Sequence, residues 1–72
     1  MPLRVRISEP GLLATLIDAF LRNECVAQRV ADDACVVVHV HAHDAREARQ
    51  EVAFFLRAWQ MLHPHAGDVR LR

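Results

Sequence analysis

The order in which two hydrophobic periods alternate along this 72-residue chain limits its fold more than any other feature. Residues 3–8, LRVRIS, carry an apolar side chain at every second position, which predicts a half-buried strand. A helical period then covers residues 12–21, with Pro10 suited to the first turn. Asn23 is expected to close this helix in a left-handed conformation.

Residues 25–42 predict a β-hairpin that turns at Asp32 and Asp33. Because opposed residues must share a face, we expect a loop with an odd number of residues, not a two-residue turn. Valines occupy one face of both arms, which we expect to be buried: Val26, Val30, Val36, Val38 and Val40. The other face then carries Cys25, Ala27, Arg29, Cys35, Val37, His39, His41 and His43.

Residues 44–64 predict the longest helix. Asp44 followed by Glu47 is a capping-box arrangement, in which each side chain can bind a free amide at the helix start, and Pro64 ends the helix. The expected buried stripe comprises Ala45, Ala48, Val52, Phe55, Trp59 and Leu62. A last short strand lies in residues 67–72, with Val69 and Leu71 pointing inward.

The resulting β-α-β-β-α-β order predicts a ferredoxin-like α+β sandwich formed by residues 1–72 as one domain. We expect a four-stranded antiparallel sheet of order 4-1-3-2, with two helices on one face. A chain this short buries only about 60% of its unfolded surface, so self-association would supplement a thin core. We therefore expect a homodimer.

Charge and cysteine content indicate the cellular compartment of the protein, but they do not indicate its class of binding partner. Nine arginines balance nine acidic residues, so net charge favours neither nucleic acid nor membrane. The N-terminus has no signal-peptide pattern, and no apolar run approaches the roughly 18 residues of a transmembrane helix. Two cysteines, Cys25 and Cys35, make no disulfide framework. We expect a cytoplasmic protein with free thiols.

The helix-free sheet face is expected to be basic. Its arginines form a candidate anion-binding site: Arg4, Arg6, Arg70 and Arg72. Arg29, His39 and His41 are expected to join them, and such a face attracts anions locally whatever the total charge. All aromatic residues fall in the predicted helices, so bases could not stack on the sheet, and nucleic acid is not the expected partner.

The motif His39-x-His41-x-His43 raises a metal-binding alternative. Residues i and i+2 of a strand share a face with Cα atoms about 6.6 Å apart, so His39 and His41 could bind one ion such as zinc. Cys25, opposite His39 or His41 in the hairpin, is the candidate third ligand. The other interpretation is that the imidazoles merely lie on a strand's outer face.

No residue pattern predicts an enzyme or a cofactor. The chain has no glycine-rich phosphate loop, and Ser8 is its only serine. Met1-Pro2 resembles the opening of the tautomerase family, in which a freed proline amine acts as the base, but we do not expect this activity. The sheet is one candidate dimer interface. The other is an apolar row on the long helix, outside its buried stripe: Phe54, Ala58 and Met61.

Residues 6–30 resemble the first half of an ACT domain, the small regulatory module. The matching turn and helix start are Glu9, Pro10, Gly11, Leu12 and Leu13. This resemblance implies a site for a small effector at Glu9–Leu12, next to a subunit interface. The chain departs from the family where Asn23-Glu24 replaces the usual glycine. An ACT-like regulatory or interaction module is therefore the leading functional expectation.

Overall fold

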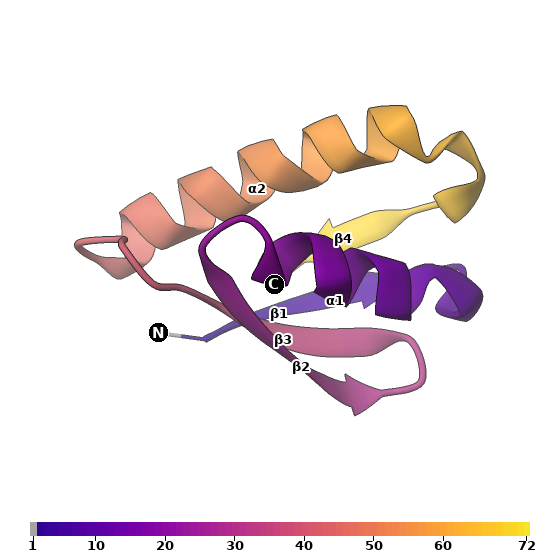
Figure 1. Ribbon diagram of the computed structural model, residues 1–72, viewed down its shortest axis with the longest axis horizontal. Coiled ribbons are helices and arrows are strands. Elements are labelled where there is room, and N and C mark those ends of the chain that lie inside the picture. Colours follow the sequence, from indigo (N-terminus) through magenta and orange to yellow (C-terminus); the bar gives the residue numbers. More distant parts are fainter. Residues whose placement is uncertain (1) are drawn as a thin grey trace.

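The computed structural model of this chain describes residues 2–72 and has the predicted β-α-β-β-α-β order (Figure 1). Its elements are β1 (Leu3–Ile7), η1 (Pro10–Leu12), α1 (Leu13–Leu21), β2 (Cys25–Ala31), β3 (Ala34–His39), α2 (Ala45–Leu62), η2 (Pro64–Ala66) and β4 (Val69–Leu71). All neighbouring strands are antiparallel, in the order β2-β3-β1-β4. The ferredoxin-like prediction is confirmed, including the sheet order.

The core lies between one face of the sheet and both helices. Its sheet side is formed by Leu3, Val5, Ile7, Cys25, Cys35 and Val37. Its helix side is formed by Leu13, Leu16 and Phe20 of α1 and by Ala48, Val52, Leu56 and Trp59 of α2. The rings of Phe20 and Phe55, 4.7 Å apart at their centroids, join the two helices. The opposite, helix-free side of the sheet is called the open face below.

The face of the hairpin that packs against the core is the opposite of the predicted one. Val5 of β1 lies directly opposite Cys35, so the odd-numbered residues of β3 face the helices. The even-numbered valines of the hairpin therefore lie outside the core: Val26, Val30, Val36, Val38 and Val40. Cysteine is among the most frequently buried residue types, which agrees with this outcome. The prediction that Arg29 and His39 lie on the open face is accordingly wrong.

The hairpin register is the expected one, although its turn is shorter than expected. Val26 lies opposite Val38, so pairing is centred on Asp32, as like-with-like pairing requires. Yet Ala31 and Ala34 flank a two-residue turn. An irregularity between Arg29 and Ala31 restores the register, because a bulge adds one residue to a single strand.

The predicted closure of α1 is wrong in its residue. Glu24, not Asn23, has the left-handed conformation, with φ 63°. The Asn23 side chain instead donates to the Ala19 carbonyl (2.7 Å), closing the last turn. Leu21, the last residue of the helical period, is 53% exposed.

The predicted N-cap at the start of α2 is present, but the far end of the helix differs from the prediction. The Asp44 carboxylate accepts a hydrogen bond from the Glu47 amide (2.8 Å), which confirms the N-cap. Leu62 was expected to be buried but is 78% exposed, since the core reaches only as far as Trp59 along α2. Leu56, absent from the predicted stripe, is buried in its place.

Candidate functional site

The four predicted anion-binding arginines lie together on β1 and at the end of β4. Arg6 and Arg70 are directly opposite each other in the antiparallel register. Arg4 and Arg72 exchange backbone hydrogen bonds in both directions (3.2 and 2.7 Å) and are likewise opposed. All four are exposed, and their positions alternate with buried β1 residues, so they share the open face. We call them the arginine cluster.

Only two of the four arginines in this cluster lie near a carboxylate side chain. Arg6 lies 3.7 Å from a carboxylate oxygen of Asp33, in the hairpin turn, and Arg70 lies 3.9 Å from Asp68. Within residues 2–72, Arg4 and Arg72 form no ion pair. Two cations directly opposed across strands destabilise a sheet, so this arrangement carries an electrostatic cost.

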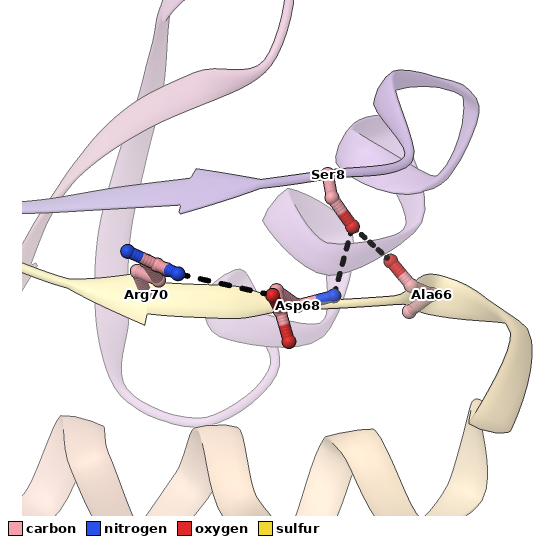
Figure 2. A network of polar contacts seen from close by, with 4 residues as sticks. All are labelled: Ser8, Ala66, Asp68 and Arg70. Carbon is pink, nitrogen blue, oxygen red and sulfur yellow. Dashed lines mark hydrogen bonds and ion pairs between the residues drawn. The ribbon is translucent and has the colours of Figure 1, made fainter.

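Ser8 positions the carboxylate that neutralises Arg70. Figure 2 shows its hydroxyl between β1 and the segment that enters β4, accepting from the Asp68 amide (2.8 Å) and facing the Ala66 carbonyl (3.4 Å). Asp68 is thereby held beside Arg70 at the end of the arginine cluster. No motif in the sequence indicated this role of Ser8. The only signal was its place at the end of an alternating strand.

A shallow cavity of about 360 Å³ lies at this end of the cluster. Its lining combines both signs of charge: Arg6, Ile7, Ser8, Asp33, Asp68, Arg70 and Arg72. Three arginines against two aspartates leave a positive balance. Guanidinium groups bind phosphate and carboxylate groups through paired hydrogen bonds, so the cavity suits an anion.

The three histidines do not share a strand face. β3 ends at His39, and His41 and His43 lie in the turn and loop that follow. The His41 ring nitrogen lies 3.9 Å from a carboxylate oxygen of Glu24. Because the strand stops, the alternation that would align the imidazoles is interrupted after His39.

Cys25 lies directly opposite His39, as one of the predicted registers requires. Both line a cavity of about 390 Å³ between the sheet and α2, together with Glu24 and Glu51. Among residues 2–72, however, no three His, Cys, Asp or Glu side chains are placed to hold one metal ion. The arrangement therefore does not support the proposed set of His39, His41 and Cys25.

Both cysteines are free and buried. Burial raises the pKa of the Cys35 thiol to about 11, although Arg29, opposite it in the hairpin, lowers it somewhat. Burial also raises the pKa of Cys25, and the nearby Glu24 carboxylate adds to this effect. Neither thiol is activated as a nucleophile, because the thiolate is the reactive form.

The predicted dimer row on α2 is exposed. Phe54 is 72% and Met61 81% accessible, and Ala58 between them is also exposed. Leu62 extends the row toward a cavity of about 490 Å³ between α1 and α2, which Ala58 also lines. The row is thus free in a single copy, and its role as an interface stays a prediction.

The predicted effector turn forms an exposed single turn of 3-10 helix, η1. Glu9 caps it only through its backbone, and Pro10 occupies the first position as predicted. A Cβ atom on Gly11 would meet only the Glu9 carboxylate, at an ordinary 3.6 Å. Since Glu9, Pro10, Gly11 and Leu12 line none of the three cavities described above, effector binding there stays a prediction.

The four aromatic side chains, Phe20, Phe54, Phe55 and Trp59, all lie on the helices, as predicted. The tautomerase alternative depends on the Met1-Pro2 bond, and Met1 lies outside the described residues. Neither helix of residues 2–72 has the length and apolar character needed to cross a membrane. In comparisons with known proteins, no family model, curated protein or solved structure matches this chain.

Proposed function

We propose that this domain is a binding module without catalytic activity, and that its arginine cluster holds a ligand bearing phosphate or carboxylate groups. The observation that carries this proposal is the direct opposition of Arg4 to Arg72 and of Arg6 to Arg70. The ligand would lie across β1 and β4 on the open face. It would contact side chains that the helices leave uncovered.

The electrostatics of the cluster support this assignment. Asp33 and Asp68 offset the charges of Arg6 and Arg70, but Arg4 and Arg72 have no such partner within residues 2–72. A bound anion would replace their mutual repulsion with charge-assisted hydrogen bonds, which are about twice as strong as neutral ones. Because arginine presents several donors in a planar fork, one guanidinium can bind two oxygens of the same group.

The neighbouring half of the open face is mainly aliphatic, with Gln28 as a polar residue opposite Val36. Arg4 lies directly opposite half-buried Val36 of β3, and exposed Val38 and Val26 continue the surface toward β2. A ligand that combines an anionic group with an apolar part would match both halves. A nucleic acid would find no aromatic ring on this face, and single-stranded binders depend on such stacking.

The ACT-like interpretation assigns the ligand to a different place, the turn at Glu9–Leu12. Substitution separates the two proposals, because these residues lie in η1 and the arginine cluster lies on β1 and β4. Gly11→Val should leave the fold intact, since Gly11 has no left-handed φ and a Cβ atom there would make only an ordinary contact with the Glu9 side chain. It would block an effector that approaches the backbone, yet leave the arginine cluster unchanged.

The test is titration of the protein with inorganic triphosphate and with citrate, followed by amide and arginine Nε–H shifts in NMR spectra. We expect the largest shifts in β1 and β4. The double variant Arg4→Gln/Arg72→Gln should weaken binding at least tenfold. Its matched control is Arg46→Gln/Arg57→Gln on exposed positions of α2, which removes the same charge.

Equal weakening in the two double variants would refute the site, because binding would then follow net charge alone. Failure of both probes to bind at millimolar concentration would refute anion binding itself. Shifts centred on residues 9–12 and abolished by Gly11→Val would favour the ACT-like effector site. Rising salt should weaken genuine binding, since exposed arginines are screened.

A further inference from the structure

The two edges of the sheet are protected very differently. β4 has only three residues, and this edge carries the positive charges of Arg70 and of Arg72, which follows the strand. β2, at the other edge, has seven residues with the sequence CVAQRVA. Arg29 is its only charged residue, and it contains no proline. Long edges with few charges are templates for pairing with another strand, which natural proteins normally prevent.

Three residues of β2 direct their backbone groups away from the sheet. The Val40 amide donates to the Glu24 carbonyl (3.0 Å), so Glu24 points toward β3. Backbone groups alternate along an antiparallel strand, so those of Cys25, Ala27 and Arg29 point outward. No turn, loop or cap hydrogen bond of residues 2–72 uses the amides or carbonyls of these three residues.

A second copy of the chain fits this edge in one self-complementary register. With a two-fold axis at Ala27, two copies of Ala27 face each other and Cys25 lies opposite the partner's Arg29. All outward-pointing groups then find a partner, and paired residues share a face, as sheet geometry requires. An axis at Arg29 would instead oppose two arginines, which is destabilising.

This register brings a cation to an acidic cavity. Arg29 has no carboxylate partner within residues 2–72, and its side chain donates only to the Asp32 carbonyl (3.2 Å). Cys25 lines the 390 Å³ cavity that Glu24 and Glu51 also line. The partner's Arg29, opposite Cys25, would therefore enter the rim of that cavity. Each copy would supply the cation that the other lacks.

We propose that two copies associate through their β2 edges around a two-fold axis at Ala27, and that Arg29 of each copy pairs with the Glu24 and Glu51 carboxylates of the other. The sheets become one continuous sheet, with all helices on the same side. The exposed row Phe54, Ala58 and Met61 is the competing interface. Anion binding on the arginine cluster does not depend on this association, since β4 lies at the opposite edge.

The first experiment measures molar mass by light scattering coupled to size-exclusion chromatography. We expect a dimer for the wild type and a folded monomer for Ala27→Pro. Proline removes an amide hydrogen that points outward, so pairing with β3 survives. Ala27→Ser, which keeps that amide, is the matched control and should remain dimeric. Circular dichroism and thermal unfolding confirm that each variant is folded.

A second variant tests the same interface by disulfide crosslinking. It remains informative even if Ala27→Pro fails to fold. Ala27→Cys places two thiols on residues about 5.5 Å apart at their Cα atoms, within the disulfide range. Mild oxidation should yield a covalent dimer in high yield. Val30→Cys is the control, because its copies would lie far from each other. Wild-type protein reports the background from Cys25 and Cys35, which are buried.

Charge exchange tests the predicted pairing. Arg29→Glu should shift the protein toward monomer, and adding Glu51→Arg to the same chain should restore the dimer. A monomeric wild type at high micromolar concentration would overturn the proposal. A dimer that survives Ala27→Pro but is lost in Phe54→Glu/Met61→Glu would overturn it in favour of the α2 row. The proposal would also be overturned if the Ala27→Cys variant were dimeric but formed no crosslink.

Discussion

Ser8 and Asp68 are joined by two hydrogen bonds, one between their backbones and one from the Asp68 backbone to the Ser8 side chain. The Ser8 amide donates to the Asp68 carbonyl (2.8 Å), and the Asp68 amide donates to the Ser8 hydroxyl (2.8 Å). Figure 2 shows how this contact joins the end of β1 to the start of β4. Gly67, between Ala66 and Asp68, has φ 72°, which brings the chain back toward Ser8. The short strand β4 is anchored at this point.

Gly67→Ala should destabilise the protein by about 2 kcal/mol, because it combines an unfavourable φ with a steric clash. A Cβ atom on Gly67 would overlap the Ser8 hydroxyl oxygen. Urea unfolding followed by circular dichroism measures the change. In the Ser8→Ala background the same substitution should cost less, since the clash is gone and only the backbone strain remains. Strictly additive effects would contradict the proposed clash.

Val37 and Val38 provide a matched test of which hairpin face is buried. Val37 is fully buried and Val38 is 37% exposed, although they are neighbours of identical chemistry. Val37→Ala should lower the free energy of unfolding by about 2 kcal/mol through a cavity, and Val38→Ala by about 0.5 kcal/mol or less. Chemical denaturation of both variants measures the difference. A larger loss for Val38→Ala would mean that the hairpin has the opposite face inward.

Glu24→Gly should stabilise the protein by roughly 0.5–1 kcal/mol. Glu24 holds a left-handed conformation that favours glycine, with φ 63°. Asn23→Gly is the control and should be neutral or destabilising, because the Asn23 side chain caps the Ala19 carbonyl. The change in melting temperature distinguishes them. Glu24→Gly also removes a carboxylate that the proposed dimer would use. The two variants are therefore compared in the Ala27→Pro background, where the protein is expected to be monomeric.

Stability should fall in mild alkali because of Cys35. Burial raises the pKa of its thiol to about 11, so the folded state keeps the proton that the unfolded state releases near pH 9. Below pH 9 the thiol is protonated in both states, so the raised pKa does not change the free energy of unfolding. As the pH rises from 9 toward 11, the unfolded state ionises first and the free energy of unfolding falls. The loss at pH 10.5 should be about 2 kcal/mol from this thiol.

Unfolding curves at pH 8 and pH 10.5 measure this effect, and Cys35→Ala is the control because it cannot ionise. Its stability should decline less over the same interval, leaving the smaller contribution from Cys25. Native protein should also react slowly with an aromatic disulfide reagent at pH 8, and quickly once unfolded. Fast reaction of Cys35 in the native state would contradict its burial.

The strands differ in how clearly their sequences indicate a buried face. In β1, Arg4 and Arg6 alternate with Leu3, Val5 and Ile7, so only one face can enter a core. In β3 both alternating sets are apolar, with Cys35 and Val37 on one side and Val36 and Val38 on the other. Periodicity therefore indicated a strand but not its orientation. The predicted burial of Val36 and Val38 is therefore wrong, although the strand itself is present.

The sequence by itself determined the order of elements and the cap at Asp44, because these depend on local periodicity and short-range hydrogen bonds. The sheet order then followed from that element order and the right-handedness of β-α-β connections. Only the tertiary structure decided which hairpin face is buried, since pairing of Val5 with Cys35 couples distant strands. It likewise decided that Arg6 faces Arg70 and that Asp33 and Asp68 lie beside them. Such proximity arises from strand register, which no single segment encodes.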